Sequence, residues 1–107
     1  SDLDKATLAQ LRRGSRLVEL LKQGQYQPTS VEKQVVSLFA GTNGYLDEIP
    51  VEQVSRYEHE LHELMDVKHP VLLREIMEKK DLTQEITGRL NSLLREFTDS
   101  FKVSVNA

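Results

Sequence analysis

The sequence contains no cysteine, which excludes disulfide bonds and zinc sites built on thiolates. It has no apolar run close to the roughly 20 residues that a membrane-spanning helix requires, so direct membrane insertion is not expected. The first residues, Ser1–Asp4, are acidic and lack the basic-then-apolar order of a signal peptide. Because an initiator methionine is also missing, we expect the chain to be a fragment or a processed product.

A strong excess of basic charge is absent as well, and the formal net charge is −3. Residues 1–30 hold five Lys or Arg against three Asp or Glu, and residues 31–107 hold nine against fourteen. Nucleic-acid binding depends on the neutralisation of phosphates by basic side chains. This charge distribution therefore argues against nucleic acid as a partner.

Sustained alternation of apolar and polar residues is missing, whereas apolar residues recur at helical spacing in almost every segment. Hydrophobic residues make up 38% of the chain and charged residues 29%, a balance typical of a globular domain and not of a disordered chain. We therefore predict a single all-α domain over residues 1–107, a bundle of about five helices.

The first predicted helix begins near Asp2 or Asp4 and carries an apolar stripe. Gly14 lies within this helix and costs about 1 kcal/mol relative to alanine, a cost that is tolerable if a neighbouring helix packs closely there. The stripe residues recur at steps of three, seven and three, and two more leucines widen the stripe: Leu8, Leu11, Val18 and Leu21, with Leu17 and Leu20.

The second predicted helix has a start signal and a stop signal. Thr29 and Glu32 form a capping-box pattern, in which each side chain satisfies a backbone N–H of the other residue. The segment Gly41–Gly44 ends the helix, since Gly and Asn tolerate the left-handed conformation. Tyr45 and Leu46 are then expected to return to the core. The predicted buried face of this helix consists of Val31, Val35, Leu38 and Phe39.

Two prolines and one acidic segment mark the last three predicted helices. Pro50 and Pro70 suit the first turn of a helix, where the missing N–H is tolerated. The last helix is expected to begin near Asp81 or Thr83, and residues 103–107 to form a frayed tail. The predicted apolar faces are Val54, Tyr57, Leu61 and Leu64; Leu72, Leu73, Ile76 and Met77; and Ile86, Leu90, Leu93, Leu94, Phe97 and Phe101.

Residues with catalytic or metal-binding chemistry are few. His59 and His62 are three apart, on one side of a helix, and two imidazoles at that spacing can bind a metal. Their sequence is not HExxH, whose histidines are four apart, and acidic residues surround them, so we interpret them as part of a solvated polar face. No spacing of Ser, His and Asp marks a catalytic triad, and Gly41–Gly44 lacks the phosphate-loop pattern GxxxxGK[ST].

Arg12, Arg13 and Arg16 form a small basic patch on the first predicted helix. Two interpretations remain open. The patch is either a solvated face with weak ion pairs or a docking surface for an acidic segment of a partner, since arginine is enriched at interfaces.

Five sequence blocks carry a resemblance to a known family: Ser1–Asp4, Leu17–Gln23, Val31–Val35, Ala40–Asp47 and, more loosely, Lys68–Leu73. Because these blocks occur in this order and at this spacing, the chain resembles the C-terminal helical domain of the α subunit of F-type ATP synthases.

This resemblance implies a helical bundle at the membrane-proximal end of the α/β hexamer, around the rotating stalk formed by the γ subunit, with a role in proton-driven ATP synthesis. It implies the β and γ subunits as partners and the regulatory ε subunit as a further candidate. Asp2 and Asp4 match the α-subunit segment that corresponds to the acidic rotor-contacting loop of β, so they are candidate rotor-facing residues.

The resemblance also implies that the fragment itself has no catalytic, nucleotide-binding or metal-binding residues. ATP and magnesium belong to an upstream domain of the parent subunit. The implied location is peripheral, at the cytoplasmic face of a bacterial plasma membrane or at the inner membrane of an organelle. Two other hypotheses are a free-standing helical adaptor that binds a partner helix in an apolar groove and a metal-dependent hydrolase that uses His59 and His62.

Overall fold

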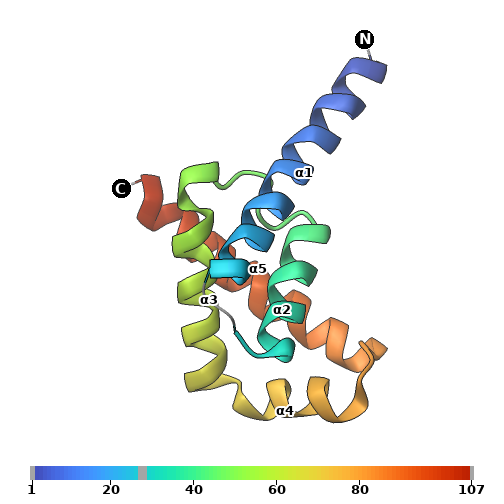
Figure 1. Cartoon of the computed structure of the whole chain (residues 1–107), viewed down its shortest axis with the longest axis vertical. Helices are drawn as coiled ribbons and strands as arrows, with labels where there is room; N and C mark the ends of the chain where they lie inside the picture. Colours follow the sequence, from blue (N-terminus) through green and yellow to red (C-terminus); the bar gives the residue numbers. More distant parts are fainter. Residues whose placement is uncertain (1, 27–28, 107) are drawn as a thin grey trace.

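The chain folds into five α-helices, a short 3-10 helix and no strand over the residues that the computed structural model describes, 2–26 and 29–106 (side chains from Asp4 to Gln23 and from Thr29 onward) (Figure 1). The predicted all-α bundle is thereby confirmed. The elements are α1 (Asp2–Tyr26), α2 (Val31–Thr42), η1 (Val51–Gln53), α3 (Val54–Lys68), α4 (Pro70–Lys79) and α5 (Gln84–Asn106).

The helices pack around α2, which contacts α1, α3 and α4. The long helix α5 crosses behind α2 and α3, and α4 closes one end of the bundle (Figure 1). The N-terminal half of α1 extends beyond the bundle at the opposite end (Figure 1). None of the described helices combines the length and the apolar character needed to cross a membrane.

The core is built where the turn after α2 meets α3 and α5. Leu46 and Ile49 in this turn have no exposed surface, which confirms the predicted return of Leu46 to the core. Tyr45 is partly buried, and its hydroxyl donates to Asn91 Oδ1 at 2.6 Å. Buried apolar residues of the three later helices complete the core: Val54, Tyr57, Leu61, Met65, Leu72, Leu73, Ile76, Ile86, Leu90, Leu93, Leu94 and Phe101. Met77, predicted to be buried, is 49% exposed.

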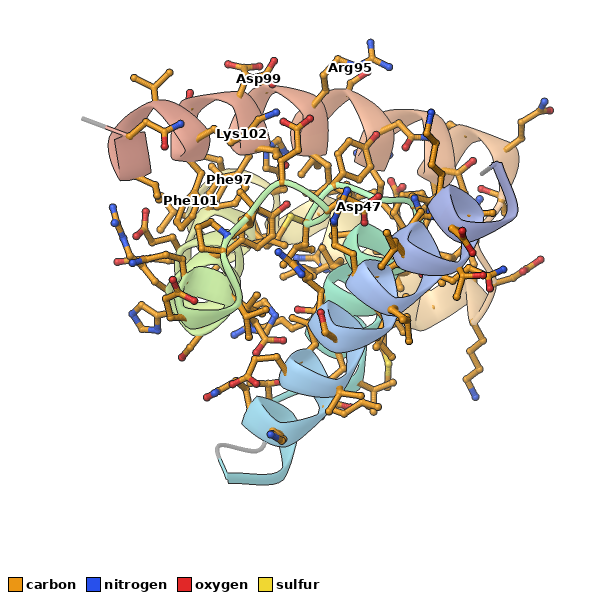
Figure 2. All side chains as sticks on the ribbon, turned by 90° about the horizontal axis from the view of Figure 1, so that it is seen from above. Asp47, Arg95, Phe97, Asp99, Phe101 and Lys102 are labelled. Atoms are coloured by element: carbon orange, nitrogen blue, oxygen red, sulfur yellow. The ribbon has the colours of Figure 1, made fainter. Side chains whose placement is uncertain are left out.

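An aromatic cluster joins α3 to α5. The ring of Tyr57 meets Phe97 and Phe101 edge to face, with centroids 5.0 and 5.3 Å apart, the arrangement that aromatic quadrupoles favour. The Tyr57 hydroxyl and Thr98 Oγ1 are 2.8 Å apart in a buried hydrogen bond. Figure 2 shows Phe97 and Phe101 on the side of α5 that faces the bundle. This cluster fixes α5 across α3.

The buried face of α2 differs from the predicted one. Val31 and Leu38 are 61% and 38% exposed. The face is rotated because α1 packs on α2 at Gly41, where a built Cβ would lie 2.8 Å from Leu17 Cδ2 and 3.0 Å from Leu20 Cδ1. The buried residues of α2 are Val36, Ser37, Ala40 and Gly41, while Val35 and Phe39 are partly buried.

The predicted apolar stripe of α1 divides into two faces. Leu20 is buried and Leu17 packs against the core. The other four stripe residues are exposed: Leu8 59%, Leu11 65%, Val18 52% and Leu21 61%. Apart from the α1 backbone and the residues next to Gly14, no heavy atom of the described residues lies within 4 Å of a Cβ built on Gly14, so no other described helix of this chain packs closely there.

The observed helix ends agree with the predicted ones in two places and differ from them in two. Pro70 lies in the first turn of α4, as predicted, and Thr83 Oγ1 accepts from the Ile86 N–H at 3.3 Å, which caps the start of α5. However, α2 begins at Val31 with Ser30 at its N-cap and no side-chain cap bond, so the capping box of Thr29 is wrong. Helix α5 continues to Asn106, so the predicted fray at residue 103 is wrong.

Candidate functional site

Two arginines of α1 hold the turn between α2 and η1. Arg16 donates from Nη2 and Nε to the carbonyl oxygen of Ile49, at 2.8 and 3.1 Å, and from Nε to that of Leu46 at 3.3 Å. Arg13 pairs with Asp47 through two hydrogen bonds of 2.8 and 3.3 Å. We call Arg13 and Arg16 the arginine clasp. The arginine clasp connects α1 to a turn whose hydrogen-bonded residues lie 30 to 34 positions later in the sequence.

The hydrogen bond and charge of Asp47 raise the pKa of Arg13, so its guanidinium keeps its charge. The planar fork of arginine matches both a carboxylate and a pair of carbonyl oxygens, which a lysine cannot reproduce. The turn itself depends on Gly44, whose φ is +85° and whose added Cβ would lie 2.5 Å from Arg13 Nη2. The prediction that Gly41–Gly44 is a helix-ending corner is confirmed, since α2 ends at Thr42.

Two of the three arginines of the basic patch predicted on α1 therefore form hydrogen bonds within the chain. Arg13 and Arg16 face the turn, and only the Arg12 side chain remains exposed without such contacts. The candidate rotor-facing residues lie in the first turn of α1. The side chain of Asp2 falls outside the described side chains, and Asp4 is exposed at the projecting end of the helix.

A buried polar cluster, formed by Ser37, Glu58 and His62, lies between α2 and α3. Ser37 Oγ and His62 Nε2 are 2.6 Å apart, and Glu58 Oε2 is 4.0 Å from the same nitrogen. Ser37 and His62 are 2% and 9% exposed. The expectation that His62 belongs to a solvated face is wrong, because His62 lies directly after the buried Leu61 and beside α2; His59 is exposed as expected.

The environment of this cluster shifts two pKa values in opposite directions. Burial raises the pKa of Glu58, and a hydrogen bond with Ser37 partly offsets the rise. Burial lowers the pKa of His62, and the charge of Lys33 lowers it further; a hydrogen bond to the Lys33 backbone and the charge of Asp66 oppose this. Ser37 has a single hydroxyl proton, so it cannot donate to both Glu58 and a neutral His62.

This cluster does not form a catalytic triad. In a triad, the acid orients the imidazole through the nitrogen opposite the nucleophile, whereas here Ser37 and Glu58 approach the same nitrogen of His62. A metal site is not supported either: among the described residues, no group of three or more His, Cys, Asp or Glu could hold a metal ion. The metal-dependent hydrolase therefore has no structural support.

Sequence reasoning missed the cluster because it placed His62 on a solvated face and did not include Ser37 in the predicted buried face of the second helix. The available signal was the position of His62 one residue after Leu61 and three before Met65, both fully buried. On α2, the small Ser37 also lies next to the buried Val36.

An open groove of about 850 Å³ lies between α5 and the junction of α3 with α4. Its apolar lining includes Leu64, Leu72, Leu93 and Phe97, and Lys68 and Arg89 lie among the polar residues at its edges. A smaller polar cleft lies between the Gly44–Glu48 turn and α5, beside Asp47 and Lys102. In Figure 2, Arg95 and Asp99 point away from the bundle on the outer side of α5.

Comparisons with known proteins agree with the all-helical fold. Residues 1–97 match the family described as "ATP synthase alpha/beta chain, C terminal domain". The chain is also 52% identical over 101 residues to "ATP synthase subunit alpha" of Aquifex aeolicus (strain VF5), an alignment that covers 94% of this chain and 20% of the relative.

The chain belongs to the family of C-terminal domains of ATP synthase α and β chains. Within this family, the identity to an α subunit supports the α-subunit type, as the sequence blocks predicted. The chain spans about one-fifth of the length of the relative that it matches.

Proposed function

We propose that this chain is a structural and mechanical domain of an ATP synthase α subunit, which packs beside the β-subunit counterparts around the central rotor and performs no catalysis itself. The observation that carries the proposal is the 52% identity over 101 residues to a protein named ATP synthase subunit alpha.

The packing supports a stiff body that can transmit force. Closely packed interiors are poorly compressible, and the core runs from the turn at Leu46 through α3 to α5. The arginine clasp adds a polar connection between α1 and the same turn. A displacement of the bundle would therefore move α1 and its projecting end together with the core.

The partners that follow from this proposal are the β and γ subunits, with the regulatory ε subunit as a further candidate. ATP and magnesium would bind upstream in the parent subunit. The complex would be peripheral to a membrane, at the cytoplasmic face of a bacterial plasma membrane or at an organelle inner membrane, and would couple proton flow to ATP synthesis.

The test is a chimera in which this chain replaces the corresponding domain of the Aquifex aeolicus α subunit, assembled with its partner subunits. We expect a complex that hydrolyses ATP and rotates. Failure of the chimera to assemble, with the chain folded on its own, would contradict the proposal.

The same chimera tests the rotor-facing candidates. Replacement of Asp2 and Asp4 by alanine is expected to leave nucleotide binding intact and to alter torque or ε-subunit inhibition only mildly, because exposed charges act through weak, salt-screened attraction. The matched control replaces Glu78 and Asp81, two exposed acids at the far end of the bundle, by alanine. Complete loss of rotation in the Asp2/Asp4 variant alone would assign these residues a larger role than we propose.

A helical adaptor remains the second candidate, and the open apolar groove between α5 and the α3–α4 junction is the observation that favours it. The coding sequence upstream of Ser1 distinguishes the two functions. A nucleotide-binding domain in the same reading frame supports the ATP synthase subunit, and a start codon directly before Ser1 supports the adaptor.

A further inference from the structure

Glu58 and His62 lie one helical turn apart on α3, and both side chains meet Ser37 of α2. Their side chains are only 12% and 11% exposed. Ser37 Oγ lies 2.6 Å from His62 Nε2 and is hydrogen-bonded to Glu58 as well. In a buried polar network, each donor needs an acceptor. The positions of the protons in this cluster therefore follow from a count of its donors and acceptors.

The neutral imidazole of His62 carries its proton on Nδ1. The ring forms a hydrogen bond with the backbone of Lys33 that raises the pKa of His62, as a bond donated by the ring to a carbonyl oxygen does. Because Nε2 is at Ser37, the donating nitrogen is Nδ1. A neutral imidazole has a single N–H, so Nε2 is an acceptor. The hydroxyl proton of Ser37 then points to Nε2.

This direction leaves the Glu58 carboxylate without the proton of Ser37. One added proton on Glu58 removes the conflict, because the carboxyl O–H can donate to Ser37 Oγ, which keeps two lone pairs for accepting. The hydrogen bonds then run in one direction, from the Glu58 carboxyl group through Ser37 and the imidazole to the backbone of α2. Each donor in this chain of hydrogen bonds has an acceptor.

A proton on His62 instead of Glu58 is less favourable. Nε2 would then donate to Ser37 Oγ, and the hydroxyl would turn to the carboxylate, so the hydrogen bonds would also be matched. That arrangement, however, holds two opposite charges in a site largely closed to water, where the loss of hydration offsets much of their attraction. The arrangement with a protonated Glu58 and a neutral His62 avoids this cost.

The charged groups around the cluster do not reverse this preference. Lys33 of α2 disfavours a charge on His62, and Asp66 of α3, which pairs with Lys33 at 2.7 Å, favours it. His59 of α3 also disfavours the charge. Glu19 and Lys22 of α1 pair with each other at 3.9 Å. The depressions that border the cluster are lined by two further charged residues and by neutral residues of α1: Glu52 and Arg56, and Leu20, Leu21 and Gln23.

We propose that Ser37, Glu58 and His62 form one proton-sharing unit, in which Glu58 takes up a proton before His62 as the pH falls. This order is the reverse of that of the free side chains, whose ordinary pKa values are 6.5 for histidine and 4.5 for glutamate. Between the two steps, the unit holds one added proton and joins α2 to α3 through an uninterrupted chain of hydrogen bonds. The proposal concerns the chain itself and does not rest on the proposed function.

An NMR titration of the unmodified chain tests the proposal. The ring-nitrogen signals of His62 and the carboxyl-carbon signal of Glu58 report on each group separately, as coupled sites require; His62→Gln and Glu58→Gln identify the signals. We expect Glu58 to gain its proton at least about half a pH unit above His62, and the neutral ring to be protonated on Nδ1. Protonation of His62 before Glu58, or a neutral ring protonated on Nε2, would overturn the proposal.

Ser37→Ala tests whether the hydroxyl connects the two groups. Its removal takes away the acceptor for the protonated carboxyl group and the donor to Nε2, so the carboxylate and the imidazolium can pair directly across the 4.0 Å that separate Glu58 from His62. We expect the titration midpoint of His62 to rise and that of Glu58 to fall, so that His62 protonates first.

Ser92→Ala, at an exposed position of α5, is the matched control and should keep the order of the unmodified chain. Circular dichroism checks that both variants remain helical. An unchanged order in a helical Ser37→Ala variant, or the same reversal in Ser92→Ala, would refute the role of Ser37 as the bridge.

Discussion

Ser37 Oγ and His62 Nε2 are 2.6 Å apart in the buried contact between α2 and α3, and Glu58 lies 4.0 Å from the same nitrogen. Ser37 has one hydroxyl proton, so it can donate to only one of these two neighbours at a time. The protonation states of Glu58 and His62 therefore contribute to the stability of this helix contact.

The pH dependence of stability should change when His62 is replaced. Since burial lowers the pKa of His62 below its ordinary value of 6.5, the unfolded chain binds the proton first. The stabilisation is therefore complete above about pH 6.5 and is lost as the pH falls towards the folded-state pKa. Urea midpoints measured between pH 7.5 and about 5 should depend less on pH in His62→Gln than in the unmodified chain. His59→Gln, at an exposed position, should keep the original dependence.

The contribution of Glu58 to stability changes with pH in the opposite direction. Burial raises its pKa from 4.5, so its contribution is most favourable below about pH 4.5 and is lost as the pH rises through the folded-state pKa. Glu58→Gln removes the buried charge, and its amide can donate to Ser37 Oγ. We expect a higher urea midpoint at pH 7 and little change at pH 4. Glu63→Gln, at an exposed position of the same helix, should change neither; a lower midpoint for Glu58→Gln at pH 7 would contradict this account.

Core truncations should be ranked by burial. Leu61 has no exposed surface, so Leu61→Ala should cost about 2–5 kcal/mol of unfolding free energy. Leu93 is 9% exposed and lines the open groove, so Leu93→Ala should fall in the lower part of that range. Glu60 forms an exposed pair with Arg56, and Glu60→Ala should cost less than about 1 kcal/mol. Denaturant unfolding with the opposite order would show that the helix faces are misassigned.

The arginine clasp should contribute more to the free energy of unfolding than an exposed arginine does. Arg16→Ala removes the guanidinium donor to the carbonyl oxygen of Ile49, whereas the Leu46 carbonyl oxygen keeps its hydrogen bond from the Ile49 N–H; the loss should cost about 1–3 kcal/mol. Arg16→Lys should recover only part of this loss, because an ammonium group lacks the planar fork. Arg12→Ala, four positions earlier on the exposed side, should stay within about 0.5 kcal/mol of the unmodified chain.

Titration of the chain with ATP and magnesium in a calorimeter should give no saturable heat. The sequence has no GxxxxGK[ST] pattern to hold phosphates, and the described residues offer no group of three metal ligands. Micromolar binding to this chain would contradict the proposal that nucleotide binds upstream in the parent subunit.

Local sequence signals were sufficient to predict the helices. The periodic apolar residues of α3 and α5, the proline that opens α4 and the glycine corner after α2 each report on backbone geometry, which depends mainly on near neighbours. The faces of α1 and α2 were less predictable. Leu8 and Leu20 have the same side chain, but Leu8 is 59% exposed and Leu20 is 3% exposed, and only the position of α2 beside one half of α1 separates them.

The buried polar cluster was also not predictable from the local sequence. A histidine three residues from another, among glutamates, is typical of a surface, and nothing local to His62 indicates Ser37, which is 25 positions away. Its burial follows from the rotation of α2, which places small residues against α1 and a serine against α3.

The sequence by itself determined the helical class, the number of helices and the family, because these depend on short-range periodicity, turn residues and ordered blocks. The tertiary structure decided which face of each helix is covered within the chain, that the arginines of α1 hold the turn after α2, and that His62 is buried. Those outcomes depend on contacts between segments distant in sequence, where the volume of a neighbouring side chain and the availability of a hydrogen-bond partner determine which side of a helix faces inward.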